Sequence, residues 1–157
     1  MGLLVSRLKG VGEVRVPATN SAVRVSSVRA EGCTLRYNLT SERAATYGPG
    51  HSNRPQVSTE EYIRTVHEWT VNLAGLDPAG VQVGNPLQLK KGGSVAFSAA
   101  GDTEAISLRW QVNSRAGVRM RTDRPRSGRL PADDEGSLEG VAAALRRAIE
   151  VCRTPAS

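Results

Sequence analysis

The sequence predicts an α+β fold, an antiparallel β-sheet with one face covered by two helices. Two patterns in its 157 residues lead to this prediction. In several short stretches apolar residues alternate with polar or charged ones, which is typical of a strand with one buried and one wet face. In two longer stretches the apolar residues recur at the period of a helix. A chain of this length is expected to form a single domain, residues 1–157.

Alternation predicts three strands in the N-terminal part of the chain, within residues 13–16, 23–25 and 35–39. In each of them an arginine stands between two apolar or aromatic residues. Residues 1–11 precede these strands as an N-terminal arm. A long loop rich in Gly, Pro, Ser and Asn is expected at 41–57, and a loop of that length is usually functional or disordered.

A helix is expected over residues 58–73. Ser58 and Glu61 have the spacing of a capping box, in which each side chain satisfies an unpaired backbone N–H at the start of a helix. Four apolar residues then recur at helical spacing: Tyr62, Val66, Trp69 and Leu73.

More strands are expected after this helix. Short ones are indicated at 81–83 and 87–89, and a three-stranded meander at 95–97, 106–112 and 118–121. The apolar residues alternate most regularly in the fourth of these five segments.

The C-terminal part predicts a second helix. A polar connection over residues 122–136 leads to this helix at 137–152, and a frayed tail follows at 154–157. An apolar stripe runs along the helix: Leu138, Val141, Ala142, Leu145, Ile149 and Cys152. Such a stripe must pack against another element, here the sheet.

Cys33 and Cys152 lie far apart in the chain and match no metal-binding or redox spacing. We expect two buried thiols rather than a disulfide. No apolar run approaches the roughly 18 residues of a transmembrane helix, and the N-terminal apolar stretch is too short for a signal peptide. These features indicate a virion or cytoplasmic protein rather than one secreted by a signal peptide.

Arginine dominates the charge of the chain. The formal net charge is +6 and the pI is about 10.0, and of 21 basic residues three are lysines. Arginine carries a planar fork of N–H donors that fits phosphate and carboxylate. A GC-rich genome would also favour arginine codons, but codon usage would not place the arginines on one face of a sheet.

The strand period assigns many of these arginines to a common face. If the apolar residues of each strand, Val118 and Met120 among them, face the core, the residues between them face solvent. The set expected to bind nucleic acid is Arg15, Arg24, Arg36, Arg109, Gln111, Arg119 and Arg121. The alternative is a solvated face whose arginines lie over apolar neighbours or form scattered salt bridges.

Neither histidine belongs to a recognisable catalytic arrangement. His67 and Glu68 lack the second histidine that a zinc-protease motif needs, because position 71 is a valine. His51 stands in the Gly/Pro-rich loop without an evident carboxylate partner or nucleophile. We therefore predict no catalytic residues, no metal site, no cofactor and a non-enzymatic function, although a site assembled from distant residues stays open.

The expected layout resembles that of the coat proteins of single-stranded-RNA phages. An N-terminal hairpin at 13–28, an arginine-bearing meander and the helix at 137–152 are arranged similarly, whereas the helix at 58–73 is an addition. The resemblance implies a structural protein of a virion that self-associates into dimers or larger assemblies and whose basic sheet face contacts packaged nucleic acid, with RNA favoured and DNA left open. The alternative is a small chaperone-like module that binds a ligand or peptide without nucleic acid.

Overall fold

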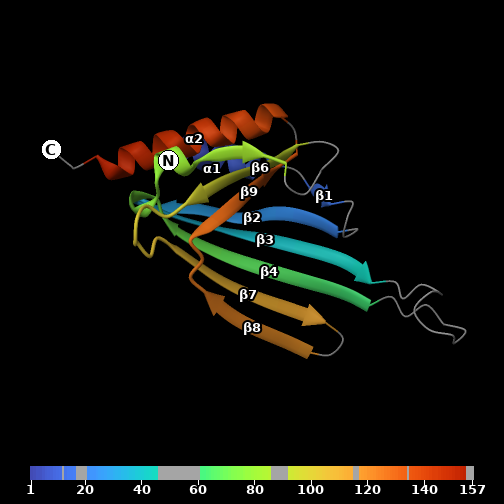
Figure 1. Ribbon diagram of the computed structural model, residues 1–157. Helices are drawn as coiled ribbons and strands as arrows, with labels where there is room; N and C mark the ends of the chain where they lie inside the picture. Colours follow the sequence, from blue (N-terminus) through green and yellow to red (C-terminus); the bar gives the residue numbers. More distant parts are fainter. Residues whose placement is uncertain are drawn as a thin grey trace, which may run out of the picture.

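The computed structural model is built of strands and two helices, with short 3₁₀ turns between two of the strands in the described part of the chain (Figure 1). The residues that it describes are 1–11, 13–16, 21–45, 61–85, 92–114, 117–133 and 135–154. The α+β class, with mostly antiparallel sheet and two helices, is confirmed.

Six strands form one antiparallel sheet in the order β1-β2-β3-β4-β7-β8. Their bounds are Val14–Val16 (β1), Ser21–Glu31 (β2), Thr34–Ala45 (β3), Glu61–Asn72 (β4), Ile106–Ser114 (β7) and Gly117–Asp123 (β8). Strands β1 to β3 therefore share a sheet with β7 and β8, and β4 joins the two groups. The meander expected at 95–97, 106–112 and 118–121 is wrong in one strand, because 95–97 belongs to the second sheet and does not pair with β7.

A second, three-stranded antiparallel sheet lies over part of the first. It has the order β5-β6-β9, with bounds Gln82–Gly84, Gly93–Ser98 and Ser127–Ala132. The 3₁₀ turns Leu73–Gly75 and Pro78–Gly80 connect β4 to β5.

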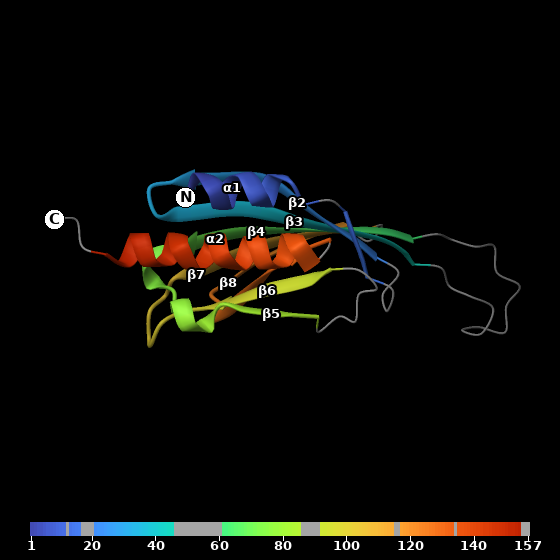
Figure 2. The ribbon, with the colours of Figure 1, turned by 90° about the horizontal axis from the view of Figure 1, so that it is seen from above.

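Helices α1 (Gly2–Lys9) and α2 (Glu135–Arg153) lie side by side along one border of the molecule. Seen from above, α2 runs between the six-stranded sheet and the three-stranded sheet (Figure 2). Leu4 and Leu8 of α1 are buried, as is the expected apolar stripe of α2 from Leu138 to Ile149. The second predicted helix is confirmed, and the segment expected to be an N-terminal arm is mostly α1.

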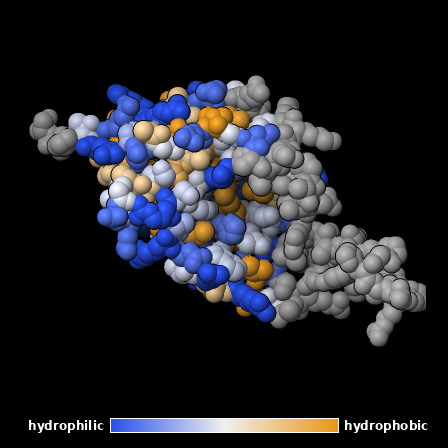
Figure 3. Space-filling model, viewed as in Figure 1, coloured by the Kyte–Doolittle hydropathy of each residue, from blue (hydrophilic) through white to orange (hydrophobic). Residues whose placement is uncertain are grey.

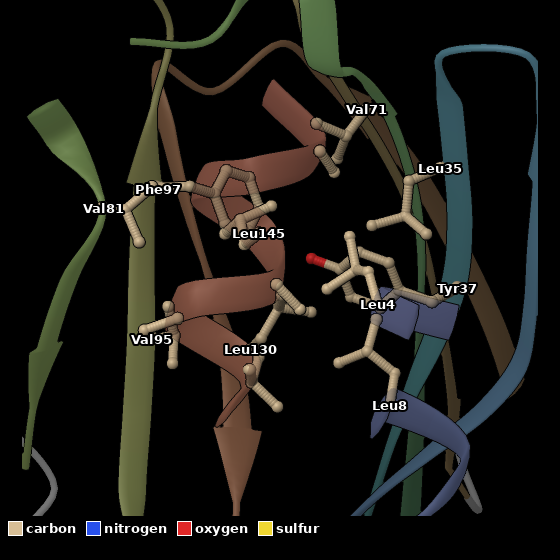
Figure 4. Packing of buried hydrophobic residues seen from close by; sticks show 14 of the residues in the cluster. Leu4, Leu8, Leu35, Tyr37, Val71, Val81, Val95, Phe97, Leu130 and Leu145 are labelled. Atoms are coloured by element: carbon tan, nitrogen blue, oxygen red, sulfur yellow. The ribbon is translucent and has the colours of Figure 1, made fainter. Parts of the chain in front are cut away.

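The core lies between the two sheets and the helices (Figure 4). Its aromatic centre joins both layers: the Tyr37 and Trp69 rings stack with centroids 6.1 Å apart, and Phe97 of β6 meets Trp69 edge-on at 6.2 Å. Gly128 of β9 lies against the Phe97 and Trp69 rings without room for a side chain.

The helix predicted at 58–73 is wrong, because this segment forms strand β4. Seven of the twelve residues of β4 are β-branched or aromatic, which favours a pleated strand. Pairing along both edges, with β3 and with β7, satisfies its backbone in the sheet. Ser58 of the expected capping box lies outside the described residues.

Other segment boundaries also differ from the prediction. Strand β3 continues through Ala45, into the expected loop at 41–57, whose remainder lies outside the described residues. The expected polar connection at 122–136 contains the end of β8 and all of β9. Its strand buries Leu130, Pro131 and Ala132, a short apolar run that the surrounding charges obscured.

The prediction of two thiols is wrong as well, because Cys33 and Cys152 form a disulfide. Cys33 lies in the β2–β3 turn and Cys152 in the last turn of α2, with their Cα atoms 5.7 Å apart. The sheet brings that turn to the end of α2, a proximity that spacing in the sequence does not reveal.

Candidate functional site

The six-stranded sheet has one side that faces away from the second sheet and the helices, and we call this side its outer face. Leu35, Tyr37 and Val71 are buried on the opposite, inner side. Because side chains alternate along a strand, their sequence neighbours point to the outer face. Residues directly opposite each other on paired strands share a side, so the register fixes which residues meet there.

Five strands place arginines on the outer face. The register aligns rows across the sheet, for example Arg24 with Thr40, and Glu68 with Arg109. The arginines of the outer face are Arg15, Arg24, Arg29, Arg36, Arg64 and Arg109. The predicted residues Arg15, Arg24, Arg36 and Arg109 are thus brought to one side, together with Gln111.

Arg119 and Arg121 lie on the inner side, contrary to the prediction. Strands β7 and β8 pair Ser114 with Gly117, and this register sets Arg121 opposite Trp110. Val118 and Met120, expected in the core, are on the outer face and are 61% and 54% exposed. Strand β8 is the edge of the sheet and its residues from 117 to 122 are all exposed, so hydrophobicity does not decide its orientation.

Arg121 instead takes part in a small cluster on the inner side. Its guanidinium carbon lies 5.9 Å from the Trp110 ring centroid, and its Nε donates to Asp123 Oδ1 over 3.3 Å. The Trp110 indole N–H donates to the other carboxylate oxygen of Asp123 over 3.2 Å. The cation over the indole face and the carboxylate that both side chains contact fasten the edge strand β8 to β7.

Sequence reasoning missed Arg29 because of a β-bulge in β2. The register shifts between Ser26 and Arg29, where Ser27 has a φ of 52°. The extra residue buries Val28 and turns Arg29 outward, opposite Arg36. The apolar positions 23, 25 and 28 signal this insertion, since their spacing changes from two to three. Arg64 was missed because its segment was assigned to a helix.

Most of these arginines have a carboxylate partner. Glu13 lies 2.8 Å from Arg24 and 3.6 Å from Arg15. The other two ion pairs are Glu42–Arg64 at 3.7 Å and Glu68–Arg109 at 4.0 Å. All of these side chains are substantially exposed, and an exposed pair contributes about 0–1 kcal/mol. A stronger anion can therefore displace the carboxylates.

Two shallow hollows are open on this face. One of about 210 Å³ is bordered by Glu13, Arg24, Glu42 and Arg64. The other, of about 310 Å³, is bordered by residues of β2, β3 and β4 that include Arg29 and Arg36. Both combine guanidinium groups with serine and threonine hydroxyls, which suit an oxyanion. Glu13 and Glu42 also border the first hollow, however, whereas Glu68 is the one carboxylate that borders the second in the described part of the chain.

The opposite side of the molecule has a mixed surface. In the view of Figure 1 hydrophobic residues are exposed as separate spots among hydrophilic ones rather than as a continuous area (Figure 3). Large continuous patches mark many protein–protein contacts. This side therefore offers no broad apolar surface in the described part of the chain.

The described residues assemble no catalytic or metal-binding group that we recognise. His67 faces the inner side between Leu39 and Trp110, and burial lowers its pKa. Groups of three or more His, Cys, Asp or Glu that could hold a metal do not occur in the described part of the chain. His51 lies outside it.

Neither described helix is both long and apolar enough to cross a lipid bilayer. No family model matches the chain, and no curated protein or solved structure matches it either.

Proposed function

We propose that this protein is a non-catalytic structural protein whose outer face binds the phosphate backbone of a nucleic acid, RNA in the first instance, within a virion or similar assembly. The observation that supports the proposal is the concentration of six arginines from five strands on the side of one sheet that faces away from the second sheet and the helices. Neighbouring strands are about 4.8 Å apart, so these arginines lie close together, and they outnumber the described glutamates of the same face, which are Glu13, Glu31, Glu42 and Glu68.

The polar residues between the arginines suit backbone contacts. Asn38, Thr40, Thr70, Ser107 and Gln111 occupy outer-face positions. Hydroxyl and amide groups donate to phosphate oxygens and position a strand without reading its bases. We therefore expect binding with little sequence preference and with a strong dependence on salt.

The free edge of the sheet supports self-association. Strand β8 ends the strand order, and within the described residues no strand pairs with its outward edge. Unprotected edges pair readily with a second chain. We expect two copies to join through β8, next to the exposed side chains of Val118 and Met120. The disulfide fits a particle outside the reducing cytosol.

Binding of a single-stranded RNA, followed by fluorescence anisotropy between about 50 and 200 mM salt, tests the nucleic-acid half of this proposal. The outer-face variant combines Arg15→Gln, Arg24→Gln and Arg109→Gln. We expect its affinity at low salt to fall by at least about tenfold and its salt slope to become about two units shallower, as loss of three phosphate contacts requires.

The matched control removes the same charge elsewhere, with Arg119→Gln, Arg124→Gln and Arg147→Gln. All three arginines are exposed. Arg119 lies on the inner side of β8, Arg124 directly follows β8, and Arg147 lies on α2. Equal losses of RNA affinity in both variants would show that only the net charge of the protein matters, which would overturn the proposal. A ligand or peptide pocket would show instead as binding that hardly changes with salt.

Light scattering of the purified protein, with and without RNA, tests the assembly half. We expect masses that are multiples of 16.7 kDa, and Met120→Lys should shift the distribution toward the monomer. A monomer under all conditions would overturn assembly and leave RNA binding to be judged by the anisotropy experiment.

A further inference from the structure

Arg29 and Arg36 stand directly opposite each other on β2 and β3. We propose that the hollow beside them is a discrete binding site for one phosphate group. That the natural phosphate belongs to a nucleic-acid strand rests on the proposed function; the site itself rests on the geometry described next.

The bulge in β2 creates this pairing. Without the extra residue, Val28 would lie opposite Arg36, and Arg29 would point into the core. The chain accepts a left-handed φ of 52° at Ser27, which a serine adopts rarely, and places two arginines directly opposite each other on the same face. Like charges directly opposite on neighbouring strands repel each other. Two unfavourable features at one place are understandable if an anion binds there.

No carboxylate neutralises this pair within the described residues. Arg15, Arg24, Arg64 and Arg109 each lie within 4.0 Å of a glutamate, whereas Arg29 and Arg36 make no such ion pair. Glu31 occupies the next outward position of β2, and it is not within ion-pair distance of either arginine. Glu68 borders the hollow but lies 4.0 Å from Arg109.

The rest of the hollow offers hydrogen-bond donors. Ser27, Asn38 and Thr70 border it together with the two arginines. The hollow of about 310 Å³ is open to solvent, so it leaves room for a phosphate group. Two guanidinium forks and neutral donors are the groups that bind phosphate oxygens in proteins.

Titration of inorganic phosphate into the full chain, with sodium chloride adjusted to hold ionic strength constant, tests the site. Two-dimensional NMR of the arginine Nε–H groups and backbone amides reports where phosphate binds. We expect saturable binding, with a dissociation constant of about 1 mM or lower and the largest shifts at Ser27, Arg29 and Arg36. No saturation, or shifts spread evenly over all arginines, would overturn the proposal.

The variants Arg29→Gln and Arg36→Gln are compared with Arg109→Gln, which removes the same charge from the same face. We expect each of the first two to raise the dissociation constant for phosphate at least about tenfold and Arg109→Gln to change it less than about twofold. Without phosphate, Arg29→Gln and Arg36→Gln should each unfold at the same temperature as the wild type or higher, because the repulsion between the two arginines is relieved. Equal weakening by Arg109→Gln would overturn the site.

Parallel RNA titrations separate this proposal from the proposed function. If phosphate binds in the hollow but RNA does not bind the protein, the site stands and the proposed function fails. If RNA binds the outer face and Arg36→Gln leaves phosphate binding unchanged, the proposed function stands and the site fails. A third result would identify the RNA strand as the source of the phosphate. Millimolar phosphate at constant ionic strength should release bound RNA from the wild type but not from Arg36→Gln.

Discussion

At the scale of single residues, Tyr37 holds the centre of the core and carries an unpaired hydroxyl. Its oxygen is buried without a hydrogen-bond partner among the described residues, and Figure 4 shows it directed from β3 into the core. Burial raises the pKa of this phenol well above 10.0. A buried polar group without a partner costs stability.

Tyr37→Phe should therefore be neutral or stabilise the protein by up to about 1 kcal/mol, because the ring stacked on Trp69 is kept. Tyr37→Ala, which removes the ring, should cost about 3–5 kcal/mol by analogy with other aromatic truncations. Urea unfolding midpoints measure both changes. A loss of more than about 1 kcal/mol in Tyr37→Phe would indicate that the hydroxyl has a partner after all.

His67 should make the protein less stable in mild acid. Burial lowers its pKa from the usual 6.5, so the unfolded chain binds a proton more readily than the folded one. The free energy of unfolding then rises with pH between the two pKa values and falls as the solution is acidified below about 6.5. Unfolding midpoints at pH 5.5 and 7.5 should differ more in the wild type than in His67→Gln; equal differences would contradict this.

At the scale of elements, helix α2 was predictable and strand β4 was not. The stripe from Leu138 to Ile149 fits a helix alone, and it packs as expected. In strand β4, Trp69 and Val71 face the core in alternation while Val66 faces outward. The helical spacing of Tyr62, Val66, Trp69 and Leu73 hid this alternation. Pairing with β3 and β7 decides the conformation, and such distant partners are not visible in a local pattern.

The disulfide links two elements that belong to different ends of the chain. It closes a loop of 119 residues, for which the loss of chain entropy predicts a stabilisation of about 4–5 kcal/mol. The double variant Cys33→Ser and Cys152→Ser should lose much of this free energy in urea unfolding, and reductant should shift the wild type to the same midpoint. An unchanged midpoint after complete reduction would contradict the prediction.

At the scale of the whole molecule, the fold class and part of the arginine face followed from the strand period. Arg24, Arg36 and Arg109 were placed correctly because their apolar neighbours contact a second layer. Arg119 and Arg121 were not, because β8 lies beyond that layer and its valine and methionine remain exposed. The second sheet escaped prediction, since β9 carries a buried proline and no clear alternation.

Gly128→Ala tests how closely the two layers are packed. A Cβ at this position would lie 2.5 Å from Phe97 and 2.8 Å from Trp69, whose rings are both buried. Overpacking of this kind should cost about 1–3 kcal/mol. Gly2→Ala, which adds its methyl to open space on α1, serves as the control and should leave the melting temperature unchanged or raise it slightly, because alanine favours a helix over glycine. Equal melting temperatures for both variants would show that the layers can separate.

The Cys33–Cys152 bond also sets how the molecule would bear tension. A force on the two ends of the chain crosses the bond and bypasses the 119-residue loop, leaving about 38 of the 157 residues extensible. Those residues span about 130 Å when stretched, against about 530 Å for the whole chain. Strands β1 and β2 lie in the loaded part and β3 to β9 in the shielded part. Under load the sheet would open from the border formed by β1 and β2. Arg15, Arg24 and Arg29 would then leave the outer face, while its remaining arginines stay in place.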